Sequence, residues 1–183
     1  MEQILSGIRD FADRAHGEQT RRYSADRYIV HPVRVMEICR QHTNDLAILA
    51  AAILHDVLED TEVKKDEMDN FLRDIMETNQ AQRTLKFVVE LTDIYVKKNF
   101  PEWNRRKRKS KEADRLSTIS PEAQTIKYAD IIDNSGEIAS QDPDFAWLYL
   151  EEATVLLDKM TKGNRQLRAL AIETVKAEKE MLQ

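Results

Sequence analysis

The chain has 183 residues, of which 42% are hydrophobic and 33% are charged, and its formal net charge is −5. This length and composition favour one globular domain with its own core and exclude a disordered chain. Four glycines and four prolines are far below average usage, which argues against turn-rich all-β and collagen-like architectures. We therefore expect a single all-α domain over residues 1–183.

Apolar residues recur at helical spacing along the whole chain. In chain order, this spacing predicts helices over residues 2–16, 32–42, 45–58, 66–77, 80–94, 102–116, 121–134, 144–161 and 164–181. Pro121 follows Ser120 and Pro143 follows Asp142, and a proline directly after a capping side chain is typical of a helix start. The connections are short and no repeat or low-complexity segment interrupts them, so we expect one helical bundle.

The sequence lacks the features of a membrane or secreted protein. No apolar stretch reaches the roughly 18 residues that a membrane-spanning helix needs, and no basic flank with an apolar run begins the chain. Cys39 is the one cysteine, which excludes an intramolecular disulfide, and its apolar neighbours indicate a packed thiol. We therefore expect a cytoplasmic protein in a reducing compartment.

The most unusual segment is an apolar run that ends in titratable side chains. Nine consecutive apolar residues, 46–54, lead directly into His55 and Asp56, and Glu59 and Asp60 follow four residues after these two. A helix that is apolar all round is a buried helix, and an ionised carboxylate at its end is costly unless it is paired or binds a metal. Acidic groups at a helix C-terminus also oppose the helix dipole. The pattern therefore favours a functional site over a solvated helix end.

Two further segments offer side chains of the same kind. Asp130 lies among apolar residues and shares a helix face with Asn134, while His31 stands near the start of a predicted helix, three residues after Tyr28. Two histidines and two carboxylates make a nitrogen and oxygen donor set that suits manganese, iron, zinc or magnesium. We therefore predict a divalent metal site, and the donor types leave the metal open.

Positive charge is concentrated in residues 97–115, which contain nine basic and three acidic residues. The net charge of this segment is +6. Because the whole chain has a net charge of −5, the remaining residues together have a net charge of −11. The segment is either a solvated helix face or a docking site for anionic groups, with Lys98, Arg105 and Arg108 as candidate phosphate contacts. The acidic chain as a whole, with Trp103 as the nearby stacking residue, argues against nucleic acid as the partner.

The ordered set of a histidine, a His-Asp pair and a distant aspartate in a helical chain resembles the HD superfamily of metal-dependent phosphohydrolases. Within that superfamily, four segments resemble consecutive motifs of the hydrolase domain of RelA/SpoT homologues: residues 11–35, 51–61, 88–93 and 120–134. The resemblance implies an HD-type helical bundle that binds Mn²⁺ and converts guanosine tetra- or pentaphosphate to GDP or GTP plus pyrophosphate. In its length, the chain is similar to the small stand-alone alarmone hydrolases.

The same resemblance implies roles for individual residues. The implied metal ligands are His31, His55, Asp56 and Asp130. The implied catalytic pair, which organises the attacking water and exchanges protons, is Glu59 and Asp60. The residues implied to contact the substrate are Arg21 and Arg22, at its phosphates or base, and Tyr28 and Asn134, in the nucleoside pocket.

Other functions within the same fold remain open at this point. The substrate could be another nucleotide, such as an adenosine alarmone or the 2′-phosphate of NADPH, or the chain could be a non-catalytic nucleotide-binding module. The presence of both Glu59 and Asp60 favours an enzyme, because binding alone does not need a proton-transfer pair. The expected partner is a small-molecule nucleotide, without membrane association, and the sequence leaves a homo-oligomer open.

Overall fold

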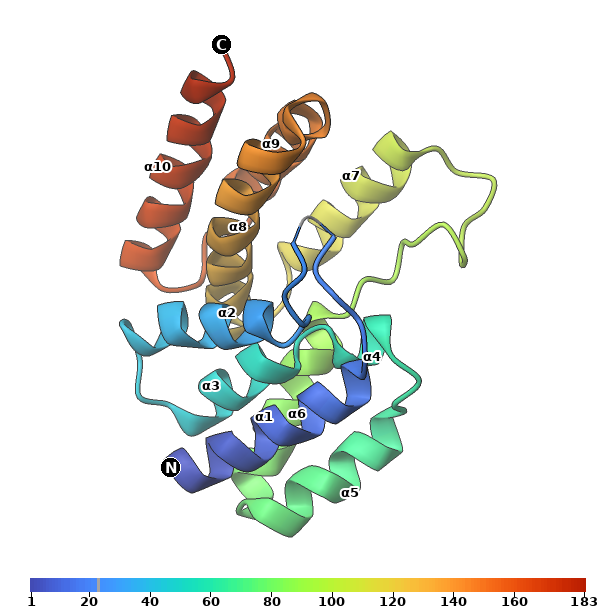
Figure 1. The fold of residues 1–183 in the computed structure, drawn as a ribbon, viewed down its shortest axis with the longest axis vertical. Coiled ribbons are helices and arrows are strands. Elements are labelled where there is room, and N and C mark those ends of the chain that lie inside the picture. The colour runs from blue at the N-terminus through green and yellow to red at the C-terminus, as the bar shows by residue number, and fades with distance from the viewer. Residues whose placement is uncertain (23) are drawn as a thin grey trace. The chain divides into compact units, whose positions relative to one another are not determined.

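The regular elements of the described residues, 1–22 and 24–183, are all helices in this computed structural model, which confirms the predicted all-α class (Figure 1). The chain divides into two compact units, Met1–Thr92 (unit 1) and Asp93–Gln183 (unit 2). In the described part of the chain, no helix combines the length and the apolar character needed to cross a membrane. A single functional domain over the whole chain stays a prediction.

Unit 1 is built around one fully buried helix. Its elements are α1 (Glu2–His16), α2 (Val30–Arg40), α3 (Leu46–Leu54), α4 (Val57–Asp60), α5 (Lys65–Ile75) and α6 (Thr78–Leu91). Every residue of α3 is buried, and this helix packs against α1, α2 and α6. Cys39 on α2 is also buried, as predicted. The apolar run in the sequence therefore forms the centre of this unit, because burying it removes the most apolar surface from water.

The end of α3 differs from the prediction. The helix expected over residues 45–58 ends at Leu54, His55 and Asp56 form a turn, and α4 begins at Val57. The ring nitrogen Nδ1 of His55 lies 2.8 Å from the carbonyl oxygen of Ala52. In a continued helix this oxygen would accept the backbone N–H of Asp56, so the imidazole takes the place of the next helical hydrogen bond.

Unit 2 contains α7 (Arg105–Leu116), α8 (Pro121–Gln141), α9 (Pro143–Lys159) and α10 (Arg165–Met181). Helices α8, α9 and α10 pack side by side, and α7 packs against α9 (Figure 1). The predicted helix starts at Pro121 and Pro143 are confirmed, with Ser120 and Asp142 as side-chain caps. The helix predicted from residue 102 begins later, because the Asn104 side chain caps α7.

The turn between α9 and α10 sits tightly against α8. Tyr128 is fully buried, and its hydroxyl donates a hydrogen bond of 2.8 Å to the carbonyl oxygen of Met160. A Cβ atom at Gly163 would lie 2.5 Å from Tyr128 Cε2 and 2.9 Å from the backbone nitrogen of Thr125. The close approach therefore requires glycine, and it anchors α8, the helix that carries Asp130.

Candidate metal centre

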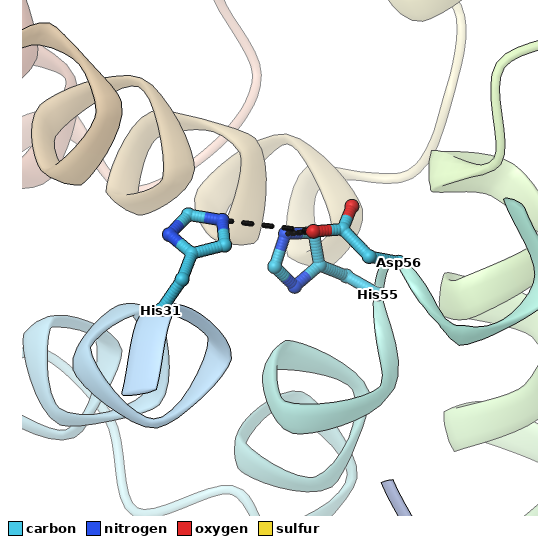
Figure 2. A group of neighbouring side chains, drawn as sticks. All are labelled: His31, His55 and Asp56. Carbon is cyan, nitrogen blue, oxygen red and sulfur yellow. Dashed lines mark ion pairs between the residues drawn. The ribbon is translucent and has the colours of Figure 1, made fainter. Parts of the chain in front are cut away.

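Three of the four predicted metal ligands converge in unit 1. His31 comes from the first turn of α2, whereas His55 and Asp56 form the turn between α3 and α4 (Figure 2). One donor atom from each of the three residues lies within 4.8 Å of the others. Asp56 Oδ2 is 3.1 Å from His55 Nε2 and 3.6 Å from His31 Nε2. The break between α3 and α4 therefore turns the His-Asp pair toward the first turn of α2.

The burial and orientation of these side chains fit a divalent metal ion. His31 and His55 are 1% and 3% exposed, and the Asp56 side chain is 21% exposed. Because a carbonyl oxygen only accepts hydrogen bonds, the bond to Ala52 places the proton of neutral His55 on Nδ1. The lone pair of the ring is then on Nε2, which faces the other two donors. Two imidazole nitrogens and one carboxylate are a donor set that manganese, iron and zinc accept.

A tyrosine hydroxyl joins this group to a second carboxylate. Tyr28 Oη lies 2.7 Å from Asp56 Oδ2 and 3.1 Å from Asp60 Oδ2. Burial, together with the negative charge of Asp56, raises the pKa of Asp60 above its usual value. Glu59 is an exposed neighbour of Asp60 on α4. A carboxylate with a raised pKa is better suited to accept a proton near neutral pH.

The two predicted substrate arginines precede α2. The guanidinium of Arg21 lies over the ring of Tyr28, 5.5 Å from its centroid. Arg22 is exposed on the same segment. The structure therefore places the Arg21 cation beside the tyrosine whose hydroxyl contacts Asp56. The substrate contacts of Arg21 and Arg22 stay a prediction.

The fourth predicted ligand, Asp130, lies in unit 2 at a cavity of about 150 Å³. It is 5% exposed, and its two carboxylate oxygens accept hydrogen bonds of 2.7 Å from Lys127 Nζ and from Asn134 Nδ2. The predicted shared face of Asp130 and Asn134 on α8 is therefore confirmed. The role of Asp130 at the same metal as the three unit 1 ligands stays a prediction.

The same cavity contains residues for which the sequence predicts no site role. Burial and the charge of Asp130 raise the pKa of Tyr149, which lines the cavity with Lys127 and Glu152. Lys127 lies three residues before Asp130 on α8, so helical spacing alone could have found this pair. Glu152 forms two hydrogen bonds of 2.8 Å with Arg105 of α7, and no local pattern marks a pair across two helices.

The three predicted phosphate contacts of the basic segment have different surroundings. Arg105 lines the unit 2 cavity and pairs with Glu152. Arg108 donates a hydrogen bond to the carbonyl oxygen of Trp103, in its own segment. Lys98 is exposed in the loop before α7. Of the three, Arg105 is therefore the one that lines this cavity, and the phosphate contacts of all three stay a prediction.

Comparison with known proteins decides the family. The model of the HD domain matches residues 28–135, which include His31, the His55-Asp56 pair and Asp130. The chain belongs to the HD-domain family. The matched range of this HD domain runs across the boundary between residues 92 and 93 that separates the two units.

Relatives of this HD domain include proteins of the predicted subgroup. Human guanosine-3′,5′-bis(diphosphate) 3′-pyrophosphohydrolase MESH1 is 30% identical over 174 residues, which cover 90% of this chain and 88% of that protein. The Vibrio cholerae guanosine-3′,5′-bis(diphosphate) 3′-pyrophosphohydrolase is 49% identical over 55 residues, 30% of this chain and 8% of that protein. The resemblance to RelA/SpoT homologues is thereby confirmed.

A solved structure has the same fold. It belongs to a metazoan orthologue of SpoT that hydrolyses ppGpp, and it matches this HD domain with a TM-score of 0.78 and 22% sequence identity. The match covers 95% of this chain and 94% of that one. The predicted helical fold of the RelA/SpoT hydrolase domain is therefore confirmed.

Proposed function

We propose that this HD-domain chain is a metal-dependent hydrolase that removes the 3′-pyrophosphate from guanosine tetra- and pentaphosphate, with Mn²⁺ as its metal. The convergence of two histidines and one aspartate within 4.8 Å carries the proposal. It is supported by human MESH1, a relative of similar length whose name states this activity.

The proposed metal ligands are His31, His55, Asp56 and Asp130. The assignment of Asp130 rests only on its position in the family motif. When bound, a divalent ion neutralises phosphate charge and makes a water molecule more acidic. The protein presents the Nε2 lone pair of His55 by holding Nδ1 on the carbonyl of Ala52. This fixed ring orientation reduces the rearrangement needed when the ion binds.

Proton transfer in the proposed reaction falls to the carboxylates of α4. The oxygen of water adds to the phosphorus that is bonded to the ribose 3′ oxygen, and the bond between this phosphorus and the 3′ oxygen breaks. The water molecule loses one proton, and the 3′ oxygen gains one. Asp60, with its raised pKa, takes the proton from water, and Glu59 orients that water. The products are GDP or GTP and pyrophosphate.

Substrate binding is assigned to cationic and polar groups of both units. Arg21 and Arg22 neutralise phosphate charge beside unit 1's metal centre, and Tyr28 contributes its ring to the nucleoside pocket. In unit 2, Arg105 and Asn134 border a cavity of about 150 Å³. Lys98 and Arg108 are further contacts for the distal phosphates. Because the family match spans both units, we take residues 1–183 as one functional domain.

The test is product analysis after incubation of purified protein with ppGpp and Mn²⁺, by anion-exchange chromatography. We expect GDP and pyrophosphate, and no turnover after EDTA treatment or with Asp56→Ala, which removes a central donor. Asp74→Ala, on an exposed face of α5, is the matched control and should retain full turnover. Parallel reactions with Mg²⁺, Zn²⁺ and Fe²⁺ test the identity of the metal.

A substrate panel separates the proposal from its alternatives. Turnover of ppApp or release of phosphate from NADPH, without turnover of ppGpp, would transfer the activity to another nucleotide. Nucleotide binding by the folded, metal-loaded chain without hydrolysis of any panel member would instead establish a binding module.

A further inference from the structure

A closed set of contacts surrounds Tyr28 in unit 1. Its hydroxyl lies 2.7 Å from Asp56 Oδ2 and 3.1 Å from Asp60 Oδ2. The ring of His16 stacks on the Tyr28 ring, with 4.4 Å between centroids and an interplanar angle of 29°. His16 Nδ1 lies 3.0 Å from Gln19 Oε1, and Gln19 Nε2 donates a 2.9 Å hydrogen bond to the carbonyl oxygen of Asp60. The contacts therefore form a closed ring that runs from Tyr28 through His16, Gln19 and Asp60 back to Tyr28.

A backbone hydrogen bond also connects Tyr28 and Gln19 directly. The N–H of Tyr28 donates a hydrogen bond of 2.9 Å to the carbonyl oxygen of Gln19. Gln19 is thus bound to Tyr28 through its main chain and to Asp60 through its side chain. These bonds fix the tyrosine relative to α4, the short helix that carries Asp60.

The position of His16 is not explained by core packing alone. The residue is 3% exposed, and its Nε2 atom is buried without a hydrogen-bond partner among the described residues. A buried polar atom without a partner is unfavourable, and an apolar side chain would fill the same space at lower cost. The features that a histidine adds at this position are a flat ring to support Tyr28 and a nitrogen to hold Gln19.

The hydroxyl of Tyr28 has one hydrogen, so it makes one full hydrogen bond at a time. The shorter distance directs that hydrogen to Asp56 Oδ2, the same oxygen that lies nearest to the two histidines. A donor on this oxygen fixes the rotation of the carboxylate about its Cβ–Cγ bond. Partners that orient a ligand in this way usually contribute strongly to metal affinity.

We infer that Tyr28 is a positioning residue that orients the carboxylate of Asp56 for metal binding, and that His16 and Gln19 hold Tyr28 in place for this purpose. The inference rests on the metal centre of the proposed function. It gives Tyr28 a second role, distinct from lining the nucleoside pocket, because the orienting bond is made without a nucleotide.

The test is a titration of the metal-free protein with Mn²⁺, followed by calorimetry and by the electron paramagnetic resonance signal of free Mn²⁺. Tyr28→Phe removes the hydroxyl and keeps the ring that stacks on His16. We expect the Kd for Mn²⁺ to rise by about 10- to 100-fold. Tyr95→Phe removes a hydroxyl from unit 2 and should leave this Kd unchanged.

Two further variants test the support of Tyr28. His16→Ala and Gln19→Leu should each raise the Kd in the same direction but by a smaller factor. The double variant Tyr28→Phe/His16→Ala should be no weaker than Tyr28→Phe, because both changes act through the same hydroxyl. Circular dichroism of each variant reports whether it is folded.

An unchanged Kd for Mn²⁺ in folded Tyr28→Phe would overturn the inference. If the KM for the nucleotide rises in that variant while this Kd stays unchanged, Tyr28 has a role in the nucleoside pocket alone. Additive losses in the double variant would overturn the part assigned to His16. The titration contains no nucleotide, so it tests the role of Tyr28 separately from the proposed substrate. A chain that binds Mn²⁺ but does not hydrolyse ppGpp would contradict the proposed substrate. The difference in Mn²⁺ Kd between this chain and Tyr28→Phe would still test the inference.

Discussion

Replacing Gly163 by alanine should destabilise the protein, because a methyl group has no space between the α9–α10 turn and α8. The added Cβ would lie 2.5 Å from Tyr128 Cε2, 2.9 Å from the backbone nitrogen of Thr125 and 3.0 Å from its Oγ1. Non-bonded carbon atoms prefer about 3.5–4.0 Å, so the turn or the helix must move by about 1 Å.

Neither neighbour moves easily. The backbone nitrogen of Thr125 belongs to α8, and Tyr128 is fully buried with its hydroxyl bonded to Met160. Overpacking of this kind costs about 1–3 kcal/mol, and two rigid neighbours place Gly163→Ala near the upper end. For a chain of this length, about 3 kcal/mol lowers the melting temperature by about 6–12 °C.

Thermal unfolding followed by circular dichroism measures this shift, with Gly7→Ala as the matched control. Gly7 lies within α1 and nothing lies within 4 Å of its added Cβ, so alanine there should stabilise the helix by about 0.5–1 kcal/mol. The two glycine-to-alanine variants should therefore shift the melting temperature in opposite directions. A Gly163→Ala protein that melts at or above the temperature of the unsubstituted chain would refute the steric argument.

Three further predictions follow from other contacts. The raised pKa of Asp60 means that its charged form is disfavoured in the folded state. At about pH 7, Asp60→Asn should therefore stabilise the metal-free protein by up to about 0.5 kcal/mol. The gain is small because solvent screens this side chain. This gain should vanish below about pH 3, where the carboxyl is neutral in both states, and thermal melts at the two pH values check the sign. Glu112→Ala should cost about 3 kcal/mol in urea unfolding, because the buried carboxylate accepts the N–H groups of Ile94 and Tyr95; a loss under 1 kcal/mol would contradict this. Arg105→Ala should raise the KM for ppGpp about tenfold with an unchanged Kd for Mn²⁺, and a parallel loss of metal affinity would argue against a pure substrate contact.

The helices were predictable because their signals are local. Proline after a capping side chain marked the starts of α8 and α9, and the nine apolar residues 46–54 marked the buried helix of unit 1. The predicted end of α8 at residue 134 is wrong, because the helix continues to Gln141. Two other errors lie where a side chain competes with the backbone. His55 ends α3 through its bond to Ala52, and the side chain of Asn104 delays the start of α7. Apolar periodicity carries no information about either bond.

The sequence by itself determined the all-helical class, the HD-family motifs and the types of donor that make a metal site credible, because composition, helical periodicity and motif order can be read along the chain without knowing which segments pack together. The tertiary structure decided which atoms meet. It places Asp56 Oδ2 beside His31 and His55, and it directs the Tyr28 hydroxyl to that same oxygen. It also ties Arg108 to a backbone carbonyl. The contacts of Asp56 depend on how segments distant in the sequence pack against one another, and the Arg108 bond depends on how its own segment turns. A hydrogen bond or metal ligand requires a placement within a few tenths of an ångström that spacing along one helix does not specify.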